Sequence, residues 1–243
     1  MSFANVYEDP SFAAAYARLD FPGTYQLAFR DLPGLLARYA PGRRALDFGC
    51  GAGRSSRFLQ GLGYDVVGVD IAPAMLALAR AADPGGDYRM LPEGDPLSAL
   101  PVPLDLVLCA FPFDNTPGLS RKVEALAALG RCLAPGGCII NLCSSAAIYT
   151  HEWVSFTTRD YPENARAVSG DPVLIAGRSI PDPRPVTDIL WTEAAWQDAF
   201  FRAGLRCLEV VRPLARGDEG IPWVSETFIP PWTIHVLTPE CAS

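Results

Sequence analysis

A glycine-rich segment near residue 50 has the residue types and spacing of a nucleotide-binding turn. An apolar segment at 44–48 is followed by three alternating glycines: Gly49, Gly51 and Gly53. Glycine lets backbone N–H groups approach a ligand closely, and the first turn of a following helix favours an anionic group. Asp70 ends the next predicted strand, where a carboxylate can accept hydrogen bonds from both hydroxyls of a ribose. These residues predict a site for a ligand that contains a nucleoside.

Arg54 and Asp47 help to decide which class of nucleoside-containing ligand this site binds. A dinucleotide-binding G-x-G-x-x-G motif would run from Gly49 through Gly51 to position 54, which Arg54 occupies. Asp47 would face a pyrophosphate unfavourably, whereas it suits a neighbouring ammonium group. An anion-binding loop with an adjacent acid and a ribose acid suits an amino-acid–nucleoside conjugate. S-adenosylmethionine (SAM) is such a compound, and NAD is the alternative.

The elements that position this loop alternate between strand and helix. Strands are predicted at 44–48, 65–70, 88–91, 104–111 and 138–143. Continuous apolar strands separated by helices indicate a parallel sheet that is covered on both faces. No helix separates two further strands, at 206–212 and 232–238, so we expect them to pair antiparallel. The predicted fold is α/β, a doubly wound Rossmann-like sheet of seven strands, five of them parallel, with a C-terminal antiparallel hairpin.

Composition divides the chain into four predicted parts. Residues 1–40 are rich in aromatic side chains and are expected to form an N-terminal helical lid, and 41–143 form the ligand-binding core. The segment 144–191 is too long for a structureless loop, so we expect it to form a substrate-pocket insert after the fifth strand. Residues 192–243 are expected to complete the sheet with a helix, capped by Thr192, and the hairpin.

The glycine segment is similar to a known family signature. Residues 45–54, followed by Asp70, resemble motif I and the acid after it in class I SAM-dependent methyltransferases. The strand at 104–107 and the turn at 133–137 are similar to later motifs of that family. The resemblance covers residues 41–143 together with the terminal hairpin, and it implies SAM as the cofactor.

The resemblance also implies a set of cofactor-binding residues. They are Asp47, Gly49, Cys50, Gly51, Gly53, Asp70 and Ile71. An acid after the third strand should bind adenine, and both Glu93 and Asp95 remain open for that role. Tyr7 and Tyr16 are expected to close over the cofactor, with packing of the lid against the core as the alternative. Ala72 departs from the family, which often has a helix-capping serine there.

The acceptor of the methyl group is expected to be small and flat. Residues 109–115 lack the Asn/Asp-Pro-Pro-Tyr/Phe signature of enzymes that methylate nucleic-acid amines or protein glutamine. Aromatic side chains after the fourth strand and in the insert can sandwich a planar ring and suit a sulfonium cation. The predicted acceptor-binding residues are Phe111, Phe113, Asp114, Tyr149, Trp153, Trp191 and Trp223. Phe156 and Trp232 are further aromatic candidates.

The predicted reaction is in-line displacement at the sulfonium methyl group, driven by proximity and exclusion of water. His151 is the candidate general base, with a polar role in the pocket wall or on the surface as the alternative. Asp114 and Asn115 resemble part of a metal-dependent catechol site, but a downstream acid pair is not evident, so no metal is expected. Asp188 and the other acids of the insert are expected to be solvated.

A second resemblance concerns the distal half of the chain. Short stretches at 151–153, 161–164, 188–192 and 223–227 resemble bacterial small-molecule methyltransferases, in particular the toxoflavin-type azapteridine N-methyltransferases. This implies methylation of a ring nitrogen, in preference to oxygen, on a planar heterobicycle. An NAD-dependent oxidoreductase and a non-catalytic ligand-binding protein on the same fold are the alternatives.

Composition excludes several other classes of protein. The 243 residues are 49% apolar and carry a net charge of −7, which argues against a nucleic-acid partner. No apolar stretch approaches the roughly 20 residues that cross a bilayer. The seven scattered cysteines contain no C-x-x-C pair, and the N-terminus lacks the pattern of a signal peptide. We therefore expect a cytoplasmic protein without a membrane partner; the sequence does not indicate its oligomeric state.

Overall fold

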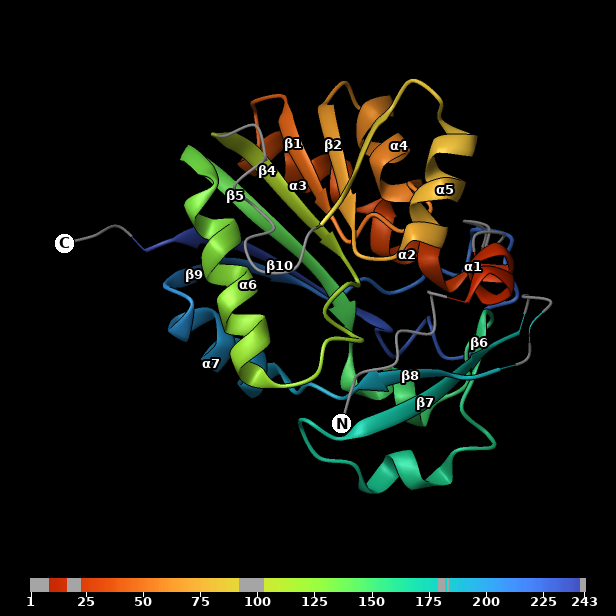
Figure 1. Cartoon of the computed structure of the whole chain (residues 1–243). Helices are drawn as coiled ribbons and strands as arrows, with labels where there is room; N and C mark the ends of the chain where they lie inside the picture. Colours follow the sequence, from red (N-terminus) through yellow and green to blue (C-terminus); the bar gives the residue numbers. More distant parts are fainter. Residues whose placement is uncertain (1–8, 17–22, 92–102, 179–181, 183, 241–243) are drawn as a thin grey trace.

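The computed structural model describes residues 9–16, 23–91, 103–178, 182 and 184–240 (Figure 1). Its largest element is a seven-stranded sheet with the order β3-β2-β1-β4-β5-β10-β9. The strands are β1 (Arg44–Phe48), β2 (Asp65–Asp70), β3 (Asp87–Met90), β4 (Leu104–Ala110), β5 (Leu133–Ser144), β9 (Leu205–Val211) and β10 (Trp232–Pro239). Strands β1 to β5 are parallel, and β10 is antiparallel to both β5 and β9. The predicted fold class and the antiparallel pairing at the C-terminus are confirmed.

Strand β5 is longer than predicted. It begins at Leu133, which pairs with Leu104, instead of at Cys138. The register with β4 shifts between Leu104 and Leu106, and Gly136 has a φ of 81°. The Pro-Gly-Gly turn is therefore part of β5 as an irregular stretch near its start, which is possible because glycine tolerates a positive φ.

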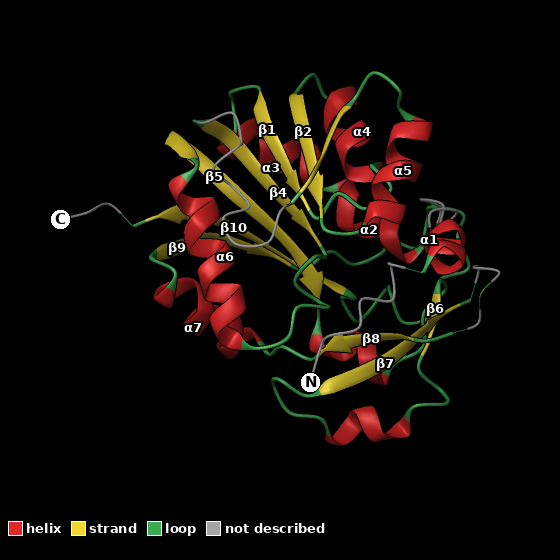
Figure 2. Ribbon diagram, viewed as in Figure 1, coloured by secondary structure: helices red, strands yellow, loops and turns green. Residues whose placement is uncertain are grey.

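Helices cover both faces of the sheet (Figure 2). Core side chains of α2 (Thr24–Arg30), α3 (Leu32–Tyr39) and α4 (Arg54–Gly61) pack with one face, where Leu106, Leu108 and Ile140 lie. Those of α6 (Leu119–Arg131) and α7 (Glu193–Arg202) pack with the opposite face, where Val107, Cys109 and Ile139 lie. This alternation of adjacent strand residues between two cores follows from the period of two in a strand and buries both faces.

Two further helices complete the N-terminal half. Helix α5 (Pro73–Ala82) packs along β2 and β3, and α1 (Pro10–Tyr16) contacts α5. The expected cap of α7 is present, because the Thr192 hydroxyl accepts the Ala195 N–H at 3.4 Å. Gly204 follows α7 with a φ of 69°, as expected for a residue that ends a helix.

The segment after β5 forms a small antiparallel sheet, which the sequence did not predict. Its strands are β6 (Phe156–Thr157), β7 (Pro172–Gly177) and β8 (Val186–Ile189), in the order β6-β7-β8. Two 3-10 helices, η2 (Ala146–Thr150) and η3 (Pro162–Arg166), precede β6 and β7. The carboxyl ends of β4 and β5 point toward this sheet (Figure 1). Within the described ranges, no helix is long and apolar enough to cross a bilayer.

Candidate cofactor and acceptor site

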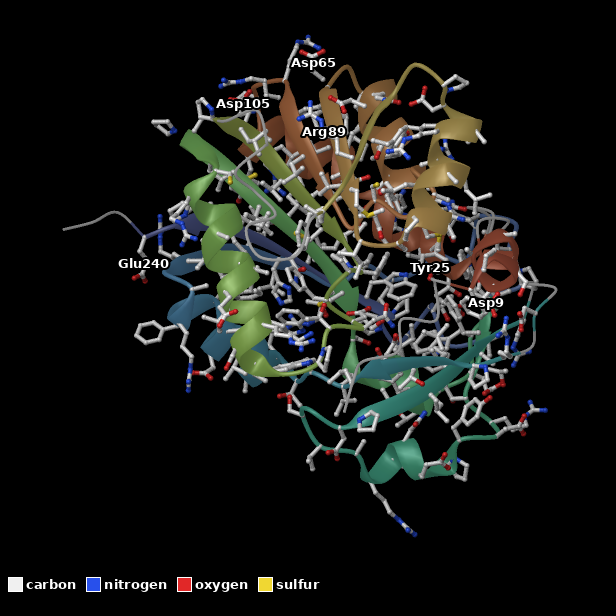
Figure 3. The ribbon with its side chains drawn as sticks, in the orientation of Figure 1. Asp9, Tyr25, Asp65, Arg89, Asp105 and Glu240 are labelled. Atoms are coloured by element: carbon white, nitrogen blue, oxygen red, sulfur yellow. The ribbon has the colours of Figure 1, made fainter. Side chains whose placement is uncertain are left out.

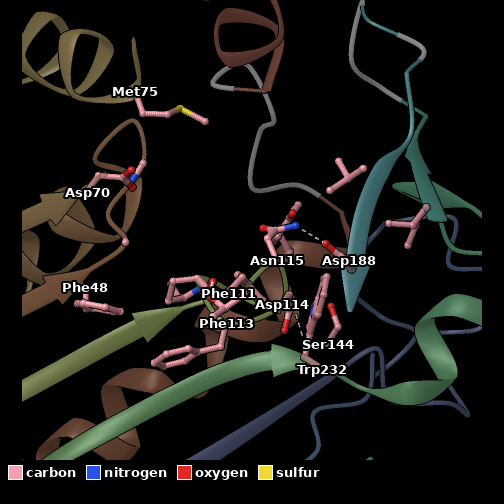
Figure 4. Close-up of a pocket in the computed structure, with 18 of the residues that line it drawn as sticks. Phe48, Asp70, Met75, Phe111, Phe113, Asp114, Asn115, Ser144, Asp188 and Trp232 are labelled. Carbon is pink, nitrogen blue, oxygen red and sulfur yellow. Dashed lines mark hydrogen bonds between the residues drawn. The ribbon is translucent and has the colours of Figure 1, made fainter. Parts of the chain in front are cut away.

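A cavity of about 310 Å³ lies at the carboxyl ends of β1, β2 and β4 (Figure 4). Its size is within the range of small-molecule sites, which occur at this edge of doubly wound sheets. The half beside the glycine loop is lined by Phe48, Gly49, Gly51, Asp70, Ile71, Met75 and Leu91. The half beside the insert is lined by Tyr25, Phe111, Phe113, Asp114, Asn115, Ser144, Phe156, Asp188 and Trp232, among others. A smaller pocket shares the glycine loop and extends to Cys50 and Arg54.

The glycine loop has a backbone that other residues would adopt with strain. Gly49, Gly51 and Gly53 have φ values of 74°, 52° and 76°. The N–H groups of Gly49 and Cys50 donate to Val69 O at 2.8 and 2.9 Å, which ties the loop to β2. A Cβ at Gly51 would meet no atom within 4 Å, so the space beside this residue is open. The loop thus presents open backbone to the cavity, as a ligand held by main-chain groups requires.

Asp70 lies at the end of β2 and lines the cavity. Its Oδ2 accepts the Gly51 N–H at 2.8 Å, and its Oδ1 accepts the Ala72 N–H at 2.8 Å. Burial raises the pKa of Asp70, and the N–H groups of Ala72 and Gly51 oppose that rise. The N–H of Ile71 also interacts with this carboxylate, which still has acceptor capacity for a hydroxyl group of a ribose.

Asp47 is buried beside the start of α4. Its side chain is fully buried, and Oδ2 accepts the hydroxyl groups of Ser55 and Ser56 at 2.7 and 2.6 Å. Oδ1 has no hydrogen-bond partner among the described residues. Burial raises the pKa of Asp47 to about 6, against the effect of the two hydroxyls. Asp47 does not line the cavity and instead ties β1 to the start of α4; its contact with an ammonium group stays a prediction.

Two carboxyl groups line the half of the cavity beside the insert. Asp114 Oδ2 accepts the Ser144 N–H at 3.0 Å. Asp188 Oδ1 accepts from Asn115 Nδ2 at 2.6 Å, and its Oδ2 accepts from the Tyr149 hydroxyl at 3.0 Å. Burial raises the pKa of both carboxyl groups. The prediction of a solvated Asp188 is wrong, because β8 carries this residue into the wall of the cavity.

Aromatic rings form the remaining wall. Tyr25 and Trp232 stack with their centroids 5.2 Å apart, and Phe111 lies 4.7 Å from Trp232. Phe156 contacts Tyr25 edge-on at 5.3 Å. Phe111 has a φ of 67°, the one positive value among the non-glycine residues that the structure describes. A strained backbone of this kind is often found at functional sites, and here it places an aromatic side chain at the end of β4.

Three of the predicted acceptor-binding residues line the cavity: Phe111, Phe113 and Asp114. The other four do not line it. Tyr149 lies behind Asp188, and the indole N–H of the fully buried Trp153 donates to a backbone carbonyl. Trp191 packs against the tryptophan of α7, and Trp223 donates to Glu219. These four side chains fill the core or the protein surface around the site.

The remaining lining residues were missed or were only general candidates. Phe48 was not predicted, Tyr25 was covered only by the general expectation for the aromatic lid, and Asn115 was considered only with Asp114 as part of a metal site. Tyr25 precedes its partner Trp232 by about 200 residues, so the sequence does not indicate their contact. Phe156 and Trp232, named only as aromatic candidates, line the cavity.

His151 lies outside the walls of both pockets. Its Nδ1 lies 3.0 Å from Ala147 O and 3.1 Å from Thr150 Oγ1, both on helix η2 immediately after β5. This position agrees with the alternative of a polar role beside the pocket, and the role of His151 as a base stays a prediction.

Some of the remaining predicted cofactor-binding residues lie outside the described residues, and others line one of the two pockets. Tyr7, Glu93 and Asp95 lie outside the described residues, as does the side chain of Tyr16, the last residue of α1. Cys50 lines the smaller pocket and Ile71 the larger one. Gly53 lines neither pocket; a Cβ there would lie 2.7 Å from the Tyr88 hydroxyl oxygen.

Comparisons with known proteins agree with this geometry. Residues 46–139 match a family model described as a methyltransferase domain. A ubiquinone biosynthesis O-methyltransferase of Xylella fastidiosa is 36% identical over 100 residues, 40% of this chain and 39% of that protein. One from Bordetella pertussis is 35% identical over 100 residues, 40% of each chain. The match thus spans about two fifths of the length of these curated relatives.

Solved structures share the fold over most of the chain. A Pyrococcus horikoshii protein has a TM-score of 0.63 at 17% identity and covers 98% of this chain and 100% of its own. A SAM-dependent methyltransferase of Clostridium acetobutylicum has a TM-score of 0.61 at 14% identity and covers 97% and 100%. The CcbJ methyltransferase of Streptomyces caelestis has a TM-score of 0.59 at 18% identity and covers 88% and 95%. Residues 46–139 are therefore similar to a methyltransferase domain, and the chain shares its fold with known SAM-dependent methyltransferases.

Proposed function

We propose that this chain is a SAM-dependent methyltransferase that acts on a small, planar heteroaromatic acceptor. The observation that carries the proposal is one continuous cavity with two chemically different halves. One half has the open backbone of Gly51 beside Asp70, and the other has aromatic walls with carboxyl groups. The first half suits an amino-acid–nucleoside conjugate, and the second suits a flat ring with polar edges.

The residues of the first half fit SAM in three places. Backbone groups of the glycine loop hold the amino-acid part, and Asp70 accepts the ribose hydroxyls. Ile71, Met75 and Leu91 give an apolar surface for adenine. When bound, SAM supplies an electrophilic methyl group on a sulfonium. The chain contributes orientation and a site from which water is excluded, which together account for most of the rate.

The second half selects the acceptor. Tyr25, Phe111, Phe156 and Trp232 offer ring faces to a planar molecule, while Asp114 and its neighbours offer hydrogen-bond acceptors to its edge. An azapteridine ring N–H of the toxoflavin type meets both requirements, and so does a phenolic hydroxyl. The relatives of known activity are named as O-methyltransferases, so the experiment must test both acceptor atoms.

Product analysis tests the proposal. The purified chain is incubated with SAM and either lumazine, a planar heterobicycle with ring N–H groups, or 3,4-dihydroxybenzoate. Release of S-adenosylhomocysteine (SAH) and the mass of the product are then measured. We expect methylated lumazine from the wild type and a loss of at least about 100-fold in Asp70→Ala. Methylation of the catechol alone would move the proposal to an oxygen acceptor, and turnover of neither compound would contradict it.

A further inference from the structure

The acceptor half of the cavity contains a buried carboxylate that can accept further hydrogen bonds. Asp114 and Asp188 both line the cavity, with 7% and 8% of their surfaces exposed. Both oxygens of Asp188 are occupied, by Asn115 and Tyr149. Asp114 Oδ2 accepts the Ser144 N–H at 3.0 Å, and the Ser144 hydroxyl also interacts with this carboxyl group. A carboxylate has about four acceptor sites, so Asp114 keeps sites in the wall of the cavity that suit a ligand with a hydrogen-bond donor.

A buried ammonium group lies behind this carboxyl group. Lys122 of α6 is fully buried, and its Nζ donates to the carbonyl of Phe113, the residue before Asp114. Its ammonium also lies over the rings of Trp191 and Trp196, at 4.9 and 5.2 Å from their centroids. Burial lowers the pKa of Lys122, and the charge of Asp114 opposes that change. Lys122 therefore stabilises the ionised form of Asp114 from the side away from the cavity.

Asp114 and Asp188, together with the charge of Lys122, form a cluster that can bind one proton. The titratable groups that face it are Lys122 on α6, Cys143 on β5, Tyr149 on η2 and Asp188 on β8. Burial raises the pKa of Cys143 and of Tyr149 well above their usual values, so both remain neutral. The charge of Lys122 balances one carboxylate, so the cluster carries −1 with both acids ionised and 0 once a proton binds. Burial favours the neutral state, which makes the cluster a proton acceptor.

We propose that Asp114 binds the N–H or O–H edge of the methyl acceptor through Oδ1 and takes its proton, and that Asp188 positions and polarises this pair. This inference rests on the proposed function. As the acceptor atom forms its bond to the methyl group, the S–CH₃ bond breaks and its electron pair stays on sulfur. The proton of the acceptor passes to Oδ1 and later returns to water. The network from Tyr149 and Asn115 through Asp188 fixes the wall against which the acceptor is bound.

The arrangement also determines which acceptors are excluded. A planar compound without a donor at its edge would cover the carboxylate of Asp114 without donating a hydrogen bond to it, and an anionic edge would meet a second negative charge. Lumazine and 1,3-dimethyllumazine form a matched pair, because the two methyl groups replace the ring N–H donors of the same heterobicycle. They therefore separate recognition by Asp114 from stacking on the aromatic walls.

Calorimetric binding to the SAH-loaded full chain tests recognition independently of turnover. We expect lumazine to bind the wild type at least about 10-fold more tightly than 1,3-dimethyllumazine. In Asp114→Asn this preference should fall below about 3-fold, while SAH binding stays unchanged. The exposed residue Asp160 provides the matched control, since Asp160→Asn should keep the full preference. Equal affinities for both compounds in the wild type, or an unchanged preference in Asp114→Asn, would overturn the inference.

The pH dependence of turnover tests the proton transfer. We expect kcat in Asp114→Asn to fall by about 10²-fold or more and to lose the acid limb of the wild-type profile. Asp188→Asn should move that limb to lower pH, because it removes a neighbouring negative charge. A variant at position 114 with kcat within about 3-fold of the wild type and an intact acid limb would overturn the inference. Failure of the wild type to bind SAH would instead contradict the proposed function.

Discussion

The carboxylate of Asp70 accepts the backbone N–H of Gly51 at 2.8 Å. This bond joins the end of β2 to the glycine loop that follows β1, so the two features form one unit. The same carboxylate accepts the N–H of Ala72 and thereby fixes the start of α5. Asp70 thus shapes the loop in addition to its proposed contact with a ribose, and its removal should affect cofactor binding in both ways.

Gly49 should not tolerate a side chain. Its φ is 74°, and a Cβ there would lie 2.5 Å from the Cβ of Pro112. We expect Gly49→Ala to lose about 1–3 kcal/mol of unfolding free energy from backbone strain alone, together with SAH binding. Urea unfolding and calorimetry would measure the two effects. Gly34→Ala is the control, because a Cβ at that position in α3 meets no atom within 4 Å and alanine favours a helix. Equal stability of the two variants would contradict this account.

Asp47 should make stability depend on pH. Burial raises its pKa to about 6 from a usual value of 3.8, so the folded state favours the neutral carboxyl group. Its contribution to stability is complete below pH 3.8 and is lost as the pH rises through about 6. The shift corresponds to about 3 kcal/mol at 1.36 kcal/mol per pKa unit.

The variant Asp47→Asn cannot ionise at this position. Relative to the wild type, its unfolding free energy should therefore rise by about 2 kcal/mol between pH 4 and pH 7. Urea titrations at several pH values would measure the difference between the two proteins. A difference that is constant over this range would show that Asp47 does not titrate in the folded state as its burial implies.

His151 should be dispensable for turnover. It does not line the cavity, and its Nδ1 lies against the carbonyl of Ala147. We expect His151→Ala to keep kcat within about 3-fold of the wild type, since general bases usually contribute 10²-fold or more. A steady-state assay with the acceptor identified by product analysis would measure this. A loss beyond about 100-fold would restore His151 as the base and count against Asp114.

Trp232 should contribute to acceptor binding, unlike Trp223. Trp232 stacks on Tyr25 in the wall of the cavity, and its indole N–H donates to Thr24 O at 2.7 Å. Trp232→Phe keeps an aromatic face and should weaken lumazine binding less than Trp232→Leu, which we expect to weaken it by about 10-fold. Trp223→Leu is the matched control outside the cavity and should leave lumazine binding unchanged. Calorimetry with the three variants would decide, and similar losses at both positions would contradict this assignment.

The features that could be predicted from the sequence are those formed by residues close together in the chain, such as the glycine loop and Asp70. The glycine loop follows β1 and Asp70 ends β2, and apolar runs identify these two strands without knowledge of tertiary contacts. The acceptor site is different, because Tyr25, Asp188 and Trp232 come from distant segments. The three strands of the insert, β6 to β8, are short and lack a clear alternation of polar and apolar residues, so the sequence did not predict them. Asp188 resembles a surface acid until β8 places it beside Asn115 and Tyr149.

Calorimetric titration with SAH is the most direct test of the central claim. Asp70→Ala removes the acid at the carboxyl end of β2, whereas Asp65→Ala removes the exposed acid at the opposite end of the same strand, where Figure 3 shows it far from Tyr25. We predict micromolar binding by the wild type and Asp65→Ala, and a loss of at least about 100-fold in Asp70→Ala. Equal binding by all three proteins, or no binding by the wild type, would contradict the assignment of this cavity to SAM.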